Sequence, residues 1–124
     1  MPLFPWFPPA LARMALAIAV MGITVLALMP APEVLIATLW DKLDHWFACF
    51  TLALLAEHAF PRQPFWRRIA PWVMAYGVGL EIVQWFTPDR DGNLMDLLAN
   101  GIGIVSYGAI RQLVFTFTRS RPTG

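Results

Sequence analysis

Residues 10–29, ALARMALAIAVMGITVLALM, form an apolar run in which Arg13 is the single charged residue. A bilayer core of roughly 30 Å needs about 20 helical residues, so this run has the length of one membrane-spanning helix. Three further apolar runs follow, at about 43–60, 69–87 and 94–117. The sequence therefore predicts an all-α membrane protein, a bundle of about four transmembrane helices in one domain that covers residues 1–124.

The composition favours the same class. Of the 124 residues, 58% are hydrophobic and 14% are charged, whereas soluble domains average about 25% charged residues. The net charge is +1, and no dense cluster of Lys and Arg marks a surface for phosphates. We therefore expect the lipid bilayer, and not nucleic acid, as the partner of this chain.

Prolines separate the apolar runs. Pro30 and Pro32 follow the first run, Pro61 and Pro64 follow the second, and Pro88 follows the third. Proline cannot donate a backbone hydrogen bond and disfavours helix in the residue before it. Connections this short predict helices that alternate in direction. The sequence around Pro30 is also a poor signal-peptide cleavage site, so we expect the first run to remain as an anchor helix.

The distribution of Lys and Arg predicts the orientation. Cytoplasmic loops of membrane proteins carry an excess of these residues. Only Lys42 and Arg90 fall on one predicted side, and the other side holds Arg13, Arg62, Arg67, Arg68, Arg111, Arg119 and Arg121. Both termini should therefore be cytoplasmic.

Polar residues gather near the predicted non-cytoplasmic ends of three helices. The second helix opens with Asp41, Lys42, Asp44 and His45. The four-residue spacing of Asp41 and His45 places these two on one helix face. Polar side chains inside a bilayer are costly and usually face the interior of a bundle, so we expect this face to point inward.

The third and fourth helices continue this pattern. Glu81 and Gln84 lie three residues apart near the end of the third helix, and Arg90 follows in the next loop. Asp96 and Asn100 open the fourth helix at four-residue spacing. The three polar faces predict one shallow pocket that opens toward the non-cytoplasmic side.

Small residues predict where helices approach closely. Ala75 with Gly79, and Ala99 with Gly103, have the four-residue spacing that brings membrane helices together. We therefore expect close packing between the third and fourth helices.

Polar residues near the cytoplasmic side are interpreted differently. Glu57 and His58 close the second run, and a basic tail extends from Arg111 to Arg121. We interpret Glu57 and His58 as interfacial residues. The tail is expected to set the topology and to attract anionic lipid headgroups.

The ordered polar motifs resemble a known family. They are Asp41, Lys42 and His45, then Glu81, Gln84, Pro88 and Arg90, and then Asp96, Asn100 and Gly103. In this order and at these spacings, residues 40 to 108 resemble the VanZ-like family of bacterial integral membrane proteins. The first helix matches only in being apolar, and Asn93 stands where relatives often carry Asp or Ser.

The resemblance implies a multi-pass protein of the bacterial cytoplasmic (inner) membrane. It also implies an effect on the cell envelope and on susceptibility to glycopeptide antibiotics. It names no reaction, so whether the protein is an enzyme stays open.

The polar residues themselves suggest roles. His45, Glu81 and Asp96 are candidate catalytic residues, because histidine and desolvated carboxyls exchange protons near neutral pH. Candidate ligand-binding residues are Asp41, Lys42, Gln84, Arg90 and Asn100. Lys42 and Arg90 could hold a phosphate or carboxylate, as in a lipid-linked or cell-wall ligand.

Other interpretations of the cluster remain open. The same groups could bind a ligand without reacting, relay protons in a transporter, or only hold the helices together in an accessory membrane protein. A metal could use His45 with Glu81 and Asp96, but the sequence lacks any two-histidine spacing of metal sites. We therefore expect no metal and no cofactor. The identity of the ligand and the oligomeric state stay open.

Overall fold

The computed structural model describes residues 2–28, 37–86 and 94–121, and all of their side chains except those of residues 37–41. Its elements, in chain order, are α1 (Pro9–Leu28), α2 (Ala37–Ala59), the single π-helical turn η1 (Phe65–Ile69), α3 (Ala70–Trp85) and α4 (Leu94–Arg119). These described residues contain no β-strand. The prediction of an all-α fold is confirmed.

The helix bounds differ most from the prediction at α2. This helix begins at Ala37, six residues before the predicted start at Leu43. Hydropathy locates only the apolar part of a helix, whereas the helix itself ends where its backbone hydrogen bonds end. The first turns of α2 contain charged residues, so the prediction left them out of the helix. The other predicted helices, 10–29, 69–87 and 94–117, agree with α1, α3 and α4 to within two residues at each end.

Proline shapes the entry into α3. The Pro64 carbonyl accepts hydrogen bonds from both the Arg68 and Ile69 N–H groups, and this shared acceptor closes the wide turn of η1. Pro71 lies in the first turn of α3, the part of a helix where proline is best tolerated. At the junction the Ala70 N–H bonds to the Phe65 carbonyl, so the helical backbone continues from η1 into α3.

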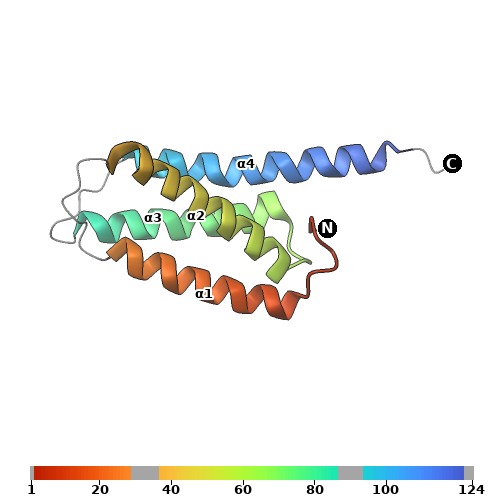
Figure 1. Cartoon of the computed structure of the whole chain (residues 1–124), viewed down its shortest axis with the longest axis horizontal. Helices are drawn as coiled ribbons and strands as arrows, with labels where there is room; N and C mark the ends of the chain where they lie inside the picture. The colour runs from red at the N-terminus through yellow and green to blue at the C-terminus, as the bar shows by residue number, and fades with distance from the viewer. Residues whose placement is uncertain (1, 29–36, 87–93, 122–124) are drawn as a thin grey trace.

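The helices form a bundle with α2 at its centre. α2 contacts α1, η1, α3 and α4, and α3 also contacts α1 and α4. Figure 1 shows that successive helices alternate in direction. The N-terminal segment, the end of α2 and the end of α4 lie toward one end, which we call the terminal end. The starts of α2 and α4 and the end of α3 lie at the other end, which we call the distal end.

The apolar core is formed largely by residues of α2. Leu52 and Ala53 are buried and belong to one apolar cluster with Ile104 of α4. At the terminal end, Arg13 Nε donates a 3.0 Å hydrogen bond to the carbonyl of Ala59, the last residue of α2. A helix C-terminus leaves carbonyls without internal partners and favours a cation, so Arg13 ties α1 to α2.

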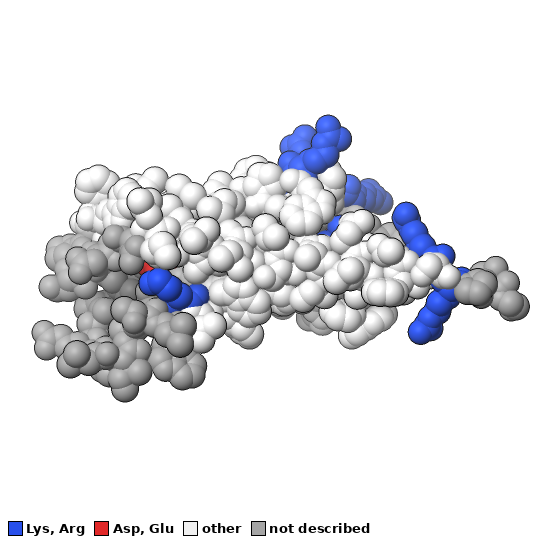
Figure 2. Space-filling view, turned by 90° about the horizontal axis from the view of Figure 1, so that it is seen from above, with Lys and Arg blue, Asp and Glu red and all other residues white. Residues whose placement is uncertain are grey.

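Many large apolar side chains lie on the outside of the bundle. Met14, Ile18 and Met21 of α1 are each more than 60% exposed. Figure 2 shows a broad uncharged belt between the Lys and Arg side chains toward the two ends of the molecule. Helices Pro9–Leu28 and Leu94–Arg119 are long and apolar enough to cross a membrane. Exposed apolar surface of this extent is typical of proteins that contact a membrane or another protein.

Two glycines set the closest helix contacts. A Cβ atom on Gly103 would collide with the Trp46 carbonyl of α2, and one on Gly77 would lie 2.9 Å from Asn100 Nδ2 of α4. By contrast, a Cβ on Gly79 would have no neighbour within 4 Å, and Ala75 is exposed. The predicted role of Ala75 and Gly79 in helix packing is wrong, because these residues lie on the outer face of α3. The Gly103 face of α4 packs on α2.

The Gly103 contact gives a test of this packing. Gly103→Ala should destabilise the protein by about 1–3 kcal/mol, the usual cost of overpacking, because a main-chain carbonyl cannot rotate away. Gly79→Ala is the matched control and should be neutral or slightly stabilising, since alanine favours a helix more than glycine does. Thermal unfolding in detergent measures both. Equal melting temperatures for the two variants would contradict the α2–α4 contact.

Candidate functional site

Three ionisable side chains from three helices meet at the distal end. His45 of α2, Glu81 of α3 and Asp96 of α4 each place a ligand nitrogen or oxygen within 4.8 Å of the others. Glu81 and Asp96 are buried, and His45 is partly exposed. We call these three residues the distal cluster. The predicted convergence of these side chains from three helices is confirmed.

Helical spacing explains why the cluster faces inward. On α3, Gly77, Glu81 and Gln84 follow each other at four and three residues and are all buried. On α4, Asp96 and Asn100 are buried at four-residue spacing. Residues three and four apart lie on one helix face, so each helix places its polar groups on its buried face.

Two basic side chains lie near Asp96. The Lys42 Nζ atom lies 4.0 Å from Asp96 Oδ1, and the His45 Nε2 atom lies 3.9 Å from Asp96 Oδ2. The Lys42 side chain is 32% exposed, whereas that of Asp96 is 6% exposed. Asp96 is therefore a buried carboxyl with a lysine and a histidine beside it.

The two predicted amide residues lie beside this cluster. Asn100 packs against Gly77, where only a residue without a side chain leaves room for its amide. Gln84 Nε2 donates a 2.8 Å hydrogen bond to the Ala27 carbonyl near the end of α1. Asn100 thus joins α4 to α3, and Gln84 joins α3 to α1.

A cavity of about 560 Å³ opens between α1, α2 and α3 next to the cluster. One part of its wall is polar and contains His45, Glu81, Gln84 and Asn100. The rest is largely apolar and includes Ile23, Leu26, Phe47, Leu52 and Leu80. The cavity therefore offers hydrogen-bonding and ionisable groups at one side and hydrocarbon at the other.

Two of the predicted site residues lie outside the described part of the structure. Arg90 falls in the segment 87–93, and the side chain of Asp41 is among those not described. Their predicted ligand-binding roles stay predictions.

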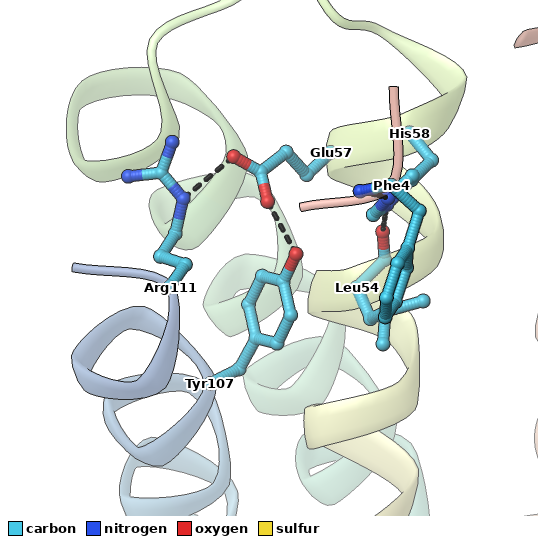
Figure 3. Close-up of polar contacts among 6 residues, drawn as sticks. All are labelled: Phe4, Leu54, Glu57, His58, Tyr107 and Arg111. Carbon is cyan, nitrogen blue, oxygen red and sulfur yellow. Dashed lines mark hydrogen bonds and ion pairs between the residues drawn. The ribbon is translucent and has the colours of Figure 1, made fainter. Parts of the chain in front are cut away.

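A second polar network, which sequence reasoning missed, lies toward the terminal end. Figure 3 shows Glu57 of α2 between Tyr107 and Arg111 of α4. Arg111 Nε donates a 2.6 Å hydrogen bond to Glu57 Oε1, and the Tyr107 hydroxyl donates to Glu57 Oε2. The Arg111 guanidinium also stacks over the ring of Phe65 at 5.1 Å. We call Glu57, Tyr107 and Arg111 the terminal network.

His58 fastens the N-terminal segment beside this network. Its Nε2 atom accepts a 2.9 Å hydrogen bond from the Phe4 N–H, and its Nδ1 atom lies 2.7 Å from the Leu54 carbonyl (Figure 3). An acceptor at Nε2 and a donor at Nδ1 together define one neutral tautomer of the ring. The segment before α1 is thereby attached to α2.

The interpretation of Glu57 and His58 as interfacial residues did not include their burial: both side chains are almost completely buried within the bundle, at 2% and 1% exposure. Arg111 was assigned to the basic tail, but it is also buried and pairs with Glu57. A signal was present in the sequence. The buried stripe of α4 that starts at Asp96 continues through Tyr107 to Arg111 at the same helical spacing.

Comparisons of the chain with models of protein families, with curated proteins and with solved structures give no match.

The terminal network predicts strong coupling between its charges. Arg111→Met should destabilise the protein by about 3–5 kcal/mol, because it leaves the Glu57 carboxylate buried without its cation. The double variant Glu57→Gln with Arg111→Met should lose much less than the sum of the two single variants. Arg119→Met, on the exposed part of the same helix, is the control. Additive losses in thermal unfolding would contradict the coupling.

Proposed function

We propose that the protein is a multi-pass protein of the bacterial inner membrane, of the VanZ-like type, that binds a lipid-linked or cell-envelope molecule at the distal cluster. The observation that carries this proposal is the cavity beside His45 and Glu81, which combines a polar and an apolar wall.

The lengths of all four helical segments support four membrane spans. α1, α2 and α4 have 20, 23 and 26 residues. α3 has 16 residues, but η1 adds five without a break, so the continuous segment covers 65–85. A helix rises about 1.5 Å per residue, so some 20 residues match the hydrocarbon core. The acidic and basic residues of α2 lower its hydropathy, yet those described mostly face the bundle or lie near its ends.

The excess of arginine at the terminal end supports an orientation with both termini in the cytoplasm. The second loop and the C-terminal end contribute most of these arginines, which include Arg62, Arg67, Arg68 and Arg119. In this orientation the distal cluster lies near the extracytoplasmic face. Its ligand would then enter from the outer leaflet or from the periplasmic side.

The two-sided wall of the cavity suits an amphiphilic ligand. Burial of apolar chain against Ile23, Leu26 and Leu80 would hold a lipid tail, since each buried CH₂ contributes about 0.8 kcal/mol. Lys42 lies beside the cluster at 32% side-chain exposure, which suits contact with a phosphate or carboxylate headgroup. Asn100 and Gln84 would orient that headgroup through their amides.

The distal cluster also has the groups for proton transfer. His45 is partly exposed and faces two buried carboxyls, Glu81 and Asp96. A histidine beside a desolvated carboxyl is a common acid–base arrangement. Enzymatic modification of the bound molecule and binding without reaction are both consistent with this arrangement, and the proposal covers both.

A second candidate function is that of a structural or accessory membrane protein. The observation that favours it is the hydrogen bond from Gln84 to the Ala27 carbonyl, which uses a predicted ligand-binding side chain to join two helices. The contacts of Lys42 and His45 with Asp96 could likewise specify helix register without any ligand.

The orientation is tested with cysteines in a Cys49→Ala background. A membrane-impermeant thiol reagent added outside intact cells or spheroplasts should label Lys42→Cys. It should label Ser120→Cys only after the membrane is permeabilised. Labelling of Ser120→Cys in intact membranes would contradict cytoplasmic termini.

The function is tested with His45→Ala, Glu81→Gln and Arg90→Ala, and with Gln112→Ala, an exposed position at the terminal end, as the control. Each variant is assayed for folded yield in detergent and for the glycopeptide susceptibility of cells that express it. We expect normal yield and loss of the susceptibility effect for the first three variants. The control should retain both.

Two other results have opposite meanings. Collapsed yield in all three variants would favour the accessory role, because the cluster would then be needed for folding. Normal yield with an unchanged susceptibility effect would contradict a ligand site at the distal cluster.

A further inference from the structure

We infer that the distal cluster binds one divalent transition-metal cation. The ligand set is a nitrogen of His45 and one carboxylate oxygen each from Glu81 and Asp96, all within 4.8 Å of one another. The inference deepens the proposed function and rests on it for the place of the cation in ligand binding. The capacity to bind the cation follows from the geometry alone.

The geometry of the cluster is close to that of a metal site. Zn²⁺ binds histidine nitrogen and carboxylate oxygen at about 2.0–2.2 Å in tetrahedral geometry, so two of its ligand atoms lie roughly 3.3–3.6 Å apart. The ligand atoms of the distal cluster lie within 4.8 Å of one another, so side-chain rotation that brings them about 1.2–1.5 Å closer would reach this spacing. The three residues come from α2, α3 and α4, which pack against each other, so the framework that holds the ligands exists before the cation binds.

The charges favour a cation as well. Two carboxyl side chains, those of Glu81 and Asp96, are buried at 2% and 4% exposure. Buried ionised carboxyls are stable when they are paired or coordinate a metal. A divalent cation would contact a carboxylate oxygen of each residue at once.

Lys42 and the cation would compete for Asp96. The ammonium group is partly exposed and has a flexible stem, so it can turn toward solvent when a metal binds. This competition gives an unusual expectation. Loss of Lys42 should tighten metal binding, whereas loss of a ligand should weaken it.

Three protein ligands leave coordination positions open, which is typical of metal sites that contact a substrate or ligand. His45 and Glu81 both line the 560 Å³ cavity. The open positions of the cation would therefore face the cavity. A phosphate or carboxylate of the proposed amphiphilic ligand could coordinate the cation there, with its apolar chain along α1.

The expectation of no metal came from ligand spacing along the sequence. Metal motifs that sequence reveals place two ligands within one turn of a helix. Here each helix supplies one ligand, and the three positions are separated by 36 and 15 residues. Their proximity exists only in the folded bundle.

The test measures metal binding by the full chain in detergent, without a histidine tag. The protein is stripped with a chelator and titrated with Zn²⁺ alone and with Mn²⁺ alone, and bound metal is counted by mass spectrometry. We expect about one ion per chain for at least one of the two metals. His45→Ala and Asp96→Asn should bind at least about tenfold more weakly, which equals 1.4 kcal/mol.

Two further variants make the test specific. Gln112→Ala changes an exposed side chain of α4 near the terminal end and should leave the affinity unchanged. Lys42→Met should raise the affinity. If a ligand variant fails to fold, the wild-type stoichiometry and the Lys42→Met and Gln112→Ala titrations still decide the test.

The outcomes separate this inference from the proposed function. Wild-type protein without a stoichiometric ion, or a folded His45→Ala variant with full affinity, would overturn the metal site. A susceptibility effect that persists in cells depleted of both metals would overturn the role of the cation in the proposed function. Stoichiometric metal binding without any susceptibility effect would retain the site and reject the function.

Discussion

Gly103 brings the backbone of α4 against the Trp46 carbonyl of α2, and this close approach fixes how the two helices are aligned. The same face of α4 carries Asp96 and Asn100 on one side of the glycine and Tyr107 and Arg111 on the other. With the register fixed at the glycine, each polar residue meets a definite partner. The distal cluster and the terminal network are therefore two consequences of one helix contact.

The terminal network and the distal cluster differ in what surrounds their polar side chains. In the terminal network, Glu57 accepts a 2.6 Å hydrogen bond from Arg111 and a second one from Tyr107, and the guanidinium also lies over the Phe65 ring. Both carboxylate oxygens of Glu57 therefore accept a hydrogen bond. In the distal cluster, the Lys42 and His45 nitrogens lie 4.0 and 3.9 Å from the Asp96 oxygens, and a cavity of about 560 Å³ lies beside His45 and Glu81. This cavity is the physical reason to propose ligand binding at the distal end and a structural role at the terminal end.

Helix periodicity accounts for the part of the fold and site that the sequence could predict. Apolar runs located the helices to within two residues at each end, except for the start of α2, which lies six residues earlier than predicted. Three- and four-residue spacings placed Glu81, Asp96 and Asn100 on inward faces. Partners from different helices could not be predicted in this way. Glu57 lies near the end of its apolar run, where an acid normally reaches water, and only the position of Arg111 on the neighbouring helix explains its burial. Hydropathy assigns Glu57 and Arg111 to the ends of their helices, because it contains no information about which residues of different helices contact each other.

α1 has a distinct role, because it contributes to the cavity wall while most of its surface faces outward. Only Ala12 of this helix is buried. Polar contacts nevertheless attach it to the bundle: Gln84 donates to the Ala27 carbonyl, and the Tyr76 hydroxyl lies 2.5 Å from Thr24 Oγ1. In hydrocarbon no water competes for these groups, so a few hydrogen bonds can hold a helix that buries little apolar surface. A lipid bilayer would solvate the outer face of α1 as readily as protein would. The cavity wall formed by α1 is therefore held in place by these hydrogen bonds more than by burial of its own apolar side chains.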